Sequence, residues 1–252
     1  QIVDRLLDSV RERAGRAHPA DVRIGSFWTC VAVTLDGRAQ GGLASTLAGG
    51  HAGHHQGRMP VESAGRLLAS SASELASLLH SESVLESSVG LATVNALLEV
   101  DEDACVEVNA ADVIADRGRG RNVAVVGHFP FIRGLRESTA NLWVLELNPR
   151  EGDLPAARAS EFLPQADVVA PTGTSLLNDT FDALMAHCRD DAFVIVLGAT
   201  TPLSPVLFEA GVDAVAGTRV VDLPAVMRAV SQGATFRQIP GKRLLTMFTS
   251  RP

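Results

Sequence analysis

The amino-acid sequence predicts an α/β protein in two parts, a small α+β part followed by a larger part with a mainly parallel sheet. In the second half, short apolar runs alternate with helical patterns, which requires crossover connections between parallel strands. The first half instead combines an amphipathic helix, a hairpin and a group of helical patterns. A chain of 252 residues can form one large domain or two small ones. We expect two domains, at residues 1–104 and 105–252.

The first part begins with apolar residues at helical spacing, which predict an amphipathic helix from residue 2. Two β-rich runs follow on either side of an Asp-Gly turn, and they predict a hairpin of strands at residues 22–34 and 38–46. The segment 47–60 is rich in Gly and His, which is typical of a loop. Helical patterns then follow at residues 61–69, 73–80 and 84–98.

The second part follows a joining segment, residues 99–120, which contains a short helical stretch and is typical of a crossing between domains. The expected strands lie at residues 122–126, 142–147, 167–170, 193–197, 213–216 and 244–248. The expected helices lie between them, near residues 131–140, 156–162, 174–188, 203–210 and 222–232. This alternation is typical of a Rossmann-like domain, in which ligands bind beyond the carboxyl ends of the strands.

Composition argues against several classes of partner and chemistry. The net charge is −7 and the densest basic cluster is RGRGR at residues 117–121, so we expect neither nucleic acid nor a membrane as a partner. No apolar run reaches the roughly 18 residues of a membrane span, and the opening residues lack the basic, apolar leader of a targeting peptide. Three widely spaced cysteines without a CxxC favour a reducing cytoplasm. With no Tyr and a single Lys, proton transfer falls to His, Asp, Glu or Cys.

The loops that follow the expected strands form a cup rich in hydroxyls and in backbone N–H groups at helix starts, as is found around a bound anion. Arg219 adds a charge-assisted contact there. The alternative is that the hydroxyls only cap helices. The candidate ligand-binding residues of these loops are Gly127, His128, Phe129, Glu146, Thr172, Gly173, Thr174, Asn178, Thr200, Thr201, Ser204, Thr218 and Arg219.

The turn after the first of these strands lacks the GxGxxG pattern of dinucleotide-binding proteins. Pro130 has no N–H to donate, and Phe129 and Phe131 occupy space that a pyrophosphate needs beside bare backbone, so we expect no NAD. Glu146 ends the next strand, where an acidic residue binds a ribose hydroxyl in such folds, and it weakly favours a nucleotide-like ligand.

Several segments of the second half resemble the DUF364 family, which is labelled a heavy-metal chelation domain; they are VAVVGHFPFI, ELNPREGDLP, LPQADVVAPTGTSLLNDT, LGATTPLSPVLFEAGVDAVAGTRVVD and AVSQGATFRQ. The IGSFWTCVAV region and SSVGLATVNALL look like the DUF4213 domain, whose fold is similar to the enolase N-terminal domain. The resemblance implies that the two domains close on each other around a site, and it suggests metal handling or anaerobic cobalamin synthesis. Enolase chemistry is not implied, because its catalytic barrel has no counterpart in this chain.

Metal binding has some support in the residues themselves. His128 beside Glu146 combines an imidazole with a carboxylate, which is the start of a site for a divalent heavy metal. The HAGHH segment offers two ligands on one face if it is helical, although its glycines favour a loop, and its histidines are His51, His54 and His55. Asn95 lies in an apolar helical run and is either a core residue or a contribution of the first domain to the cleft.

Three hypotheses of function follow. The first is a protein that binds a heavy metal or a metal chelate in the cleft between the domains, in metal homeostasis or cobalamin-related metabolism. The alternative is a transferase or lyase that acts on a small anionic or nucleotide-like ligand there, with His128 and Glu146 as acid/base groups. The third is a nucleotide-sensing module without chemistry. We expect a small anionic ligand or metal chelate as the partner and a homodimer as the assembly.

Overall fold

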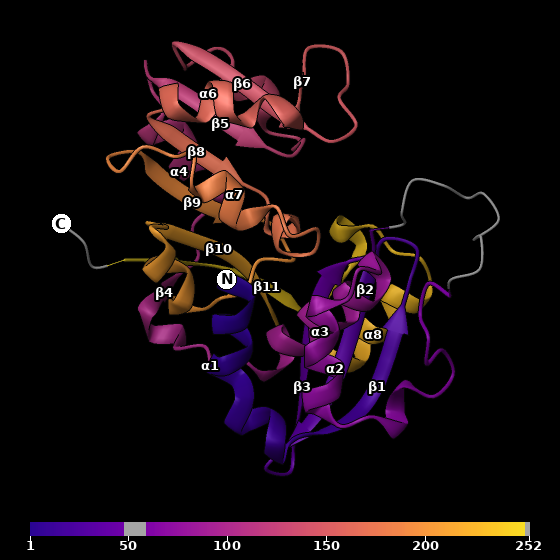
Figure 1. Ribbon diagram of the computed structural model, residues 1–252. Coiled ribbons are helices and arrows are strands. Elements are labelled where there is room, and N and C mark those ends of the chain that lie inside the picture. The colour runs from indigo at the N-terminus through magenta and orange to yellow at the C-terminus, as the bar shows by residue number, and fades with distance from the viewer. Residues whose placement is uncertain (48–58, 250–252) are drawn as a thin grey trace.

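The computed structural model describes residues 1–47 and 59–249, and these form two sheets (Figure 1). The small sheet is antiparallel, in the order β1-β2-β3, and the large sheet has the order β4-β11-β10-β9-β8-β5-β6-β7. The strands of the small sheet are β1 (His18–Ile24), β2 (Trp28–Leu35) and β3 (Arg38–Ser45). Those of the large sheet are β4 (Cys105–Val106), β5 (Asn122–Val126), β6 (Asn141–Glu146), β7 (Leu154–Pro155), β8 (Val168–Pro171), β9 (Phe193–Leu197), β10 (Ala214–Val220) and β11 (Lys242–Phe248).

The small sheet is covered on both faces. On one face lie α1 (Ile2–Arg16), α2 (Ala72–Ser77) and α3 (Val84–Leu97), with α3 packed directly on β2 and β3. On the other face lies α8 (Leu223–Ser231), which the second half of the chain contributes (Figure 1). Apolar side chains of α8 form one buried cluster with Cys30, Ala32 and Leu43 of the sheet. The second part of the chain therefore covers one face of the small sheet.

The predicted hairpin is confirmed, although one of its strands is shorter than expected. Asp36 and Gly37 both have a positive φ, 49° and 76°, which is the geometry of a type I′ turn. The expected strand at 22–34 is wrong as a single unit, because residues 22–24 belong to β1 and the chain turns before β2. The N–H of Gly25 bonds the carbonyl of Trp28, and a Cβ at Gly25 would lie 2.4 Å from the Val230 oxygen. The approach of α8 thus requires glycine at this turn.

The predicted Rossmann-like sheet is confirmed. Strands β10 to β7 are parallel to one another, while β11 and β4 are antiparallel to their neighbours. Along the chain, β5, β6, β8, β9 and β10 take the spatial order 2-1-3-4-5, so connections leave β5 and β8 in opposite directions. This topological switch point lies between the carboxyl ends of β5 and β8. In such folds a ligand binds at this point.

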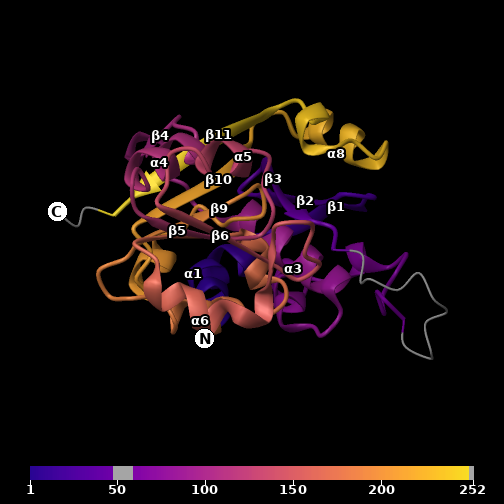
Figure 2. The same ribbon diagram turned by 90° about the horizontal axis from the view of Figure 1, so that it is seen from above.

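Helices cover both faces of the large sheet. Figure 2 shows α4 and α5 on one side of it and α6 with α1 on the other. The helices of the second part, besides α8, are α4 (Ala110–Arg117), α5 (Ile132–Leu135), α6 (Ala159–Phe162) and α7 (Phe181–Met185). One apolar cluster joins the two sheets, since Val33 and Val94 share it with Val126 and Val196. The boundary at residues 104/105 and the likeness of the first part to the enolase N-terminal domain stay predictions.

Several expected helices are shorter or tighter than predicted. Residues 174–188 do not form one helix, because a 3-10 turn at Gly173–Leu176 and α7 are separated by Asp179 with φ 55°. Residues 203–210 form a 3-10 helix at Pro205–Ala210, and only Leu67–Ala69 of the expected helix at 61–69 is helical. Within the described residues, none of the helices has the length and apolar character needed to cross a membrane.

Candidate functional site

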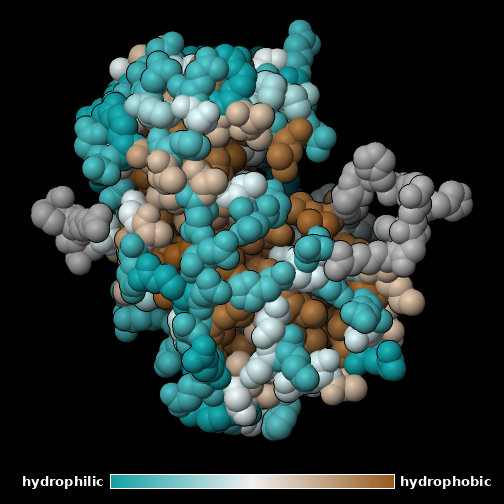
Figure 3. Space-filling view, in the orientation of Figure 1, coloured by the Kyte–Doolittle hydropathy of each residue, from teal (hydrophilic) through white to brown (hydrophobic). Residues whose placement is uncertain are grey.

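Two cavities open at the switch point and meet at Phe129, Thr172 and Thr174. The first, here the aromatic cavity, has a volume of about 420 Å³ and lies between the two parts, with Trp28, Phe129, Phe131, Phe236 and Thr218 among its walls. The second, here the histidine cavity, has a volume of about 580 Å³ and has both apolar and polar walls; its polar residues include His128, Glu146, Asn148, Asn178 and Thr180. Figure 3 shows apolar residues exposed on one face of the molecule where the two parts meet.

The aromatic cavity is walled in part by two pairs of packed aromatic rings. Phe129 and Phe131 stack with centroids 5.2 Å apart and ring planes within 13°, and Trp28 packs at a tilt against Phe236. Trp28 Nε1 and Thr218 Oγ1 are buried and have no hydrogen-bond partner among the described residues. Both atoms are closed to solvent, so they lie inside the wall of the cavity and do not face the space that a bound molecule would fill.

His128 is held in one orientation by two carboxylates. Its backbone N–H donates to Glu146 Oε2 at 2.9 Å, and its Nδ1 lies 2.9 Å from Asp153 Oδ2. The Asp153 side chain is only 1% exposed. Burial raises the pKa of Asp153, but hydrogen bonds from the Arg150 N–H and from His128 outweigh it, so the pKa lies below its ordinary value. Since an ionised carboxylate only accepts, Nδ1 carries a proton and donates it to Asp153.

Glu146 organises the turn after β5. One of its oxygens accepts the His128 N–H, and the other accepts the N–H of Leu147 at 2.8 Å. Gly127, just before the turn, has φ 104°, and a Cβ there would lie 3.2 Å from Thr172. Glycine thus lets the ends of β5 and β8 approach each other, and Glu146 fixes the peptide that carries His128.

The hydroxyls of the cup divide into caps and free groups. Thr172 Oγ1 accepts the N–H of Thr174 at 3.3 Å, and Ser204 Oγ accepts the N–H of Val206, so these two cap 3-10 helices. Thr201 Oγ1 is buried without a partner among the described residues. A Cβ at Gly173 would lie 2.4 Å from that oxygen, which shows how closely the loops after β8 and β9 pack.

Thr200 and Asn95 join the two parts. The Thr200 hydroxyl accepts the N–H of Ser45 at 3.0 Å and bonds its hydroxyl at 2.9 Å. Asn95 Nδ2 donates to the carbonyls of Leu43 and Thr200 at 2.8 and 3.1 Å. Thr200 also lines the aromatic cavity, whereas Asn95 lies behind it as a bridge.

Arg219 does not line either cavity. Its neighbour Thr218 faces the aromatic cavity, and consecutive residues of β10 point to opposite faces, so Arg219 points into a separate hollow. The cation that does line the aromatic cavity is Arg237, which sequence reasoning did not select. Asn178 lines the histidine cavity and its side-chain oxygen accepts from the Thr180 hydroxyl at 2.7 Å.

Sequence reasoning also missed Asp153, Trp28 and Phe236. Asp153 is the last acidic residue of the ELNPREGD loop, and only the folding of that loop back onto β5 reveals its contact with His128. The two aromatic residues come from segments far apart in the chain, so their pattern carries no signal of a shared wall.

The donors for a metal ion are sparse. Among residues 1–47 and 59–249, no three His, Cys, Asp or Glu side chains converge as a metal site would need. Burial raises the pKa of Cys30 to about 12 and that of Cys188 to about 11, so these thiols stay protonated and are poor ligands. The expected histidine ligands of the HAGHH segment, His51, His54 and His55, lie outside the described residues.

Comparisons with known proteins match this architecture. Residues 109–248 match the model of the DUF364 family and residues 8–98 that of DUF4213, both described as "Putative heavy-metal chelation". An uncharacterized protein of Methanocaldococcus jannaschii is 26% identical over 232 residues, which cover 88% of this chain and 86% of that protein.

Two solved structures of DUF364 family proteins of unknown function have the same fold. The protein from Pyrococcus horikoshii has a TM-score of 0.85 and 19% identity, over 99% of this chain and 100% of that chain. The protein from Desulfitobacterium hafniense has a TM-score of 0.80 and 25% identity, over 98% of this chain and 97% of that chain.

Proposed function

The chain belongs to the DUF364 family, and on this premise we propose that it binds a metal chelate, a small organic ligand that holds a metal ion, at the switch point. The organic part occupies the aromatic cavity, and the metal faces the histidine cavity. His128 contributes the protein's ligand to the metal through Nε2. The metal is cargo in this proposal.

The single observation that supports the proposal best is the hydrogen bond between His128 Nδ1 and the buried Asp153. A histidine that binds a metal usually donates its other ring N–H to a carboxylate, which fixes the tautomer and makes the free nitrogen a better ligand. Asp153 is ionised at neutral pH, because its pKa is lowered by the Arg150 N–H and by His128 more than burial raises it. The pair therefore has the chemistry of a ligand with its supporting carboxylate.

A chelate fits the described residues better than a bare ion. No third side chain of the usual ligand types joins His128 and Asp153 within residues 1–47 and 59–249, and in this proposal the remaining donors belong to the organic ligand. The walls of the aromatic cavity suit a flat organic group, since the side chains that line it include Trp28, Phe129, Phe131 and Phe236. Arg237 offers a charge for an anionic substituent.

Calorimetric titration with two probes tests the proposal. The first probe is Ni²⁺ alone, and the second is the one-to-one complex of Ni²⁺ with phenanthroline, a flat chelate with open coordination positions. The wild type is expected to bind the complex more tightly than the bare ion, and His128→Ala should weaken binding of the complex by about tenfold or more.

The matched control is His187→Ala, which removes an exposed imidazole that lines neither cavity. It should leave the affinity for the complex unchanged within about twofold, a difference of roughly 0.4 kcal/mol. Equal affinity of wild type and His128→Ala, with both proteins folded by circular dichroism, would contradict the proposal.

A second function is favoured by the same pair. An imidazole held by a buried carboxylate at a cavity wall is also the arrangement of a general base. As an enzyme, the chain would use His128 Nε2 to take a proton from a small anionic substrate. Incubation with a metabolite extract, followed by mass spectrometry, tests this alternative: a compound consumed by the wild type and by Asp190→Asn, but left intact by His128→Ala, would support catalysis.

We also propose that the protein is located in the cytoplasm and that it forms a homodimer. Size-exclusion chromatography with light scattering measures the assembly directly, and a monomer at micromolar concentration would exclude the dimer.

A further inference from the structure

A third hollow, here the arginine hollow, lies on the opposite face of β10 from the aromatic cavity. It has a volume of about 440 Å³, and three guanidinium groups from separate elements line it: Arg13 of α1, Arg38 of β3 and Arg219 of β10. The other lining residues are Leu35, Asp36, Gln40, Leu98, Glu99 and Val100. None of these residues lines the aromatic or histidine cavity.

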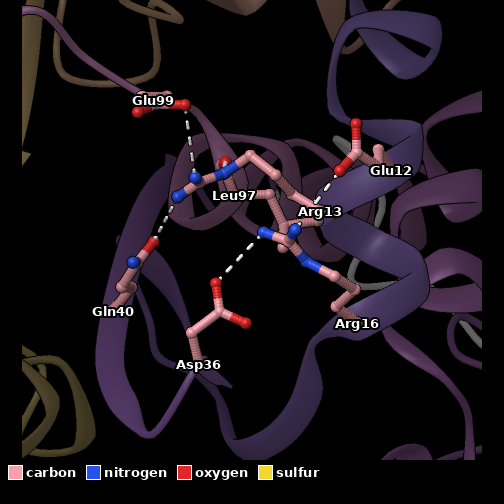
Figure 4. Close-up of polar contacts among 7 residues, drawn as sticks. All are labelled: Glu12, Arg13, Arg16, Asp36, Gln40, Leu97 and Glu99. Atoms are coloured by element: carbon pink, nitrogen blue, oxygen red, sulfur yellow. Dashed lines mark hydrogen bonds and ion pairs between the residues drawn. The ribbon is translucent and has the colours of Figure 1, made fainter.

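Arg13 is held rigidly by neutral groups (Figure 4). Its Nε donates to the carbonyl of Leu97 at 2.6 Å, and its Nη2 donates to Gln40 Oε1 at 3.1 Å. Its carboxylate contact is Glu99, at 3.4 Å from Nη1, and the Glu99 side chain is 84% exposed. An exposed ion pair of this kind is weak, so an incoming anion can displace Glu99.

The other carboxylates nearby are already paired. Asp36 lies 3.0 Å from Arg16, which points toward it from α1 in Figure 4. Glu102 is 3.6 Å from Arg219 Nε and makes a closer ion pair with Arg243. Arg38 is exposed and makes no side-chain hydrogen bond or ion pair with any residue in the described ranges.

These contacts leave the arginine hollow with an excess of positive charge in a protein whose net charge is −7. Guanidinium forks match the oxygens of phosphate and carboxylate groups, and clustered arginines recognise such groups in many proteins. We propose that the arginine hollow binds a small polyanion. Arg38 and Arg219 donate hydrogen bonds to the phosphate or carboxylate oxygens of the polyanion, and Arg13 forms a rigid side of the site.

Calorimetric titration with pyrophosphate and with citrate, at constant ionic strength, tests the proposal and separates the two kinds of oxyanion. The variant is Arg38→Gln with Arg219→Gln, and the matched control is Arg119→Gln with Arg121→Gln, which removes two exposed charges from a loop after α4. The wild type and the control should bind at least one probe with the same affinity within about twofold. The Arg38/Arg219 variant should bind it about tenfold more weakly or worse.

A wild type that binds neither probe would overturn the proposal, and so would an equal loss in the variant and the control. A second variant, Glu99→Gln, keeps the proposal testable even if the Arg38/Arg219 variant does not fold. It changes one exposed residue and removes the carboxylate that competes for Arg13. It should raise the affinity for the bound probe by about threefold, as removal of one screened charge contact does. An unchanged or lower affinity would contradict the displacement of Glu99.

Discussion

The contact between His128 and Asp153 gives the sharpest prediction, for the substitution Asp153→Asn. Asparagine keeps the size of the side chain but removes its charge. In the wild type, Oδ2 accepts both from His128 Nδ1 at 2.9 Å and from the Arg150 N–H at 3.1 Å, while Oδ1 is buried without a partner among the described residues. The asparagine oxygen can replace Oδ2, but the charge that strengthens both bonds is lost.

The size of the effect follows from those two bonds. A hydrogen bond to a charged group contributes roughly 1.5–3 kcal/mol, and a neutral one about 1 kcal/mol. Because both bonds become neutral, we expect the free energy of unfolding to fall by about 2 kcal/mol. For a chain of this length, that loss lowers Tm by about 4–8 °C.

The effect should depend on pH in one direction. The pKa of Asp153 is lowered in the folded state from 3.8, because the hydrogen bonds outweigh the effect of burial. A depressed carboxyl pKa stabilises the fold above the unfolded pKa, and this contribution disappears as pH falls through the folded value. The gap in stability between wild type and Asp153→Asn is therefore complete at pH 7 and narrows below about pH 4.

Urea unfolding followed by circular dichroism at pH 7 and at pH 3 measures both quantities. The control is Asp190→Asn, an exposed aspartate near α7, which should match the wild type at both pH values. Equal stability of Asp153→Asn and wild type at pH 7 would refute the view that His128 is held by an ionised partner. A gap that widens toward pH 3 would refute the assigned ionisation.

Three further predictions concern the loops and the core. Thr218→Val removes a buried hydroxyl that has no partner among the described residues, so Tm in thermal unfolding should stay within about 2 °C of the wild-type value or rise. A large fall in Tm would show that the hydroxyl is structural. Gly173→Ala places a Cβ 2.4 Å from Thr201 Oγ1 and 2.7 Å from the Thr201 backbone. Thermal unfolding should therefore show that the free energy of unfolding falls by about 1–3 kcal/mol. An unchanged Tm would contradict the close packing of these two loops. Burial raises the pKa of Cys30 to about 12, so this thiol should resist iodoacetamide at pH 8 in the folded protein and react after unfolding. Peptide mass spectrometry locates the label. Rapid labelling of Cys30 in the native protein would contradict its burial.

Much of the fold was accessible from local patterns. The alternation of apolar runs with helical patterns predicted the parallel strands within a few residues, because strands buried on both faces read as continuous apolar runs. The Asp-Gly pair predicted the hairpin, because these two residues readily adopt the positive φ angles of a type I′ turn. The place of α8 was not accessible, because its packing on β2 depends on contacts between residues almost two hundred positions apart.

The candidate site was predictable in part. The sequence predicted a site beyond the carboxyl ends of the parallel strands, and the structure brings Phe129, Thr172 and Thr174 together at the switch point there. Thr218 and Arg219 were both assigned to the cup, although adjacent side chains of a strand point to opposite faces, and of these two residues the aromatic cavity includes Thr218. That rule was available from sequence, whereas the fold of the loop that brings Asp153 to His128 was not.

The central claim is that the protein holds a metal together with an organic ligand at His128. Native mass spectrometry with elemental analysis tests it most directly, on wild type and His128→Ala purified without oxygen or added chelators. The account predicts one metal ion and one organic adduct on the wild type, and the loss of both from His128→Ala. A metal ion without an organic adduct on the wild type, or the same adduct on both proteins, would contradict it.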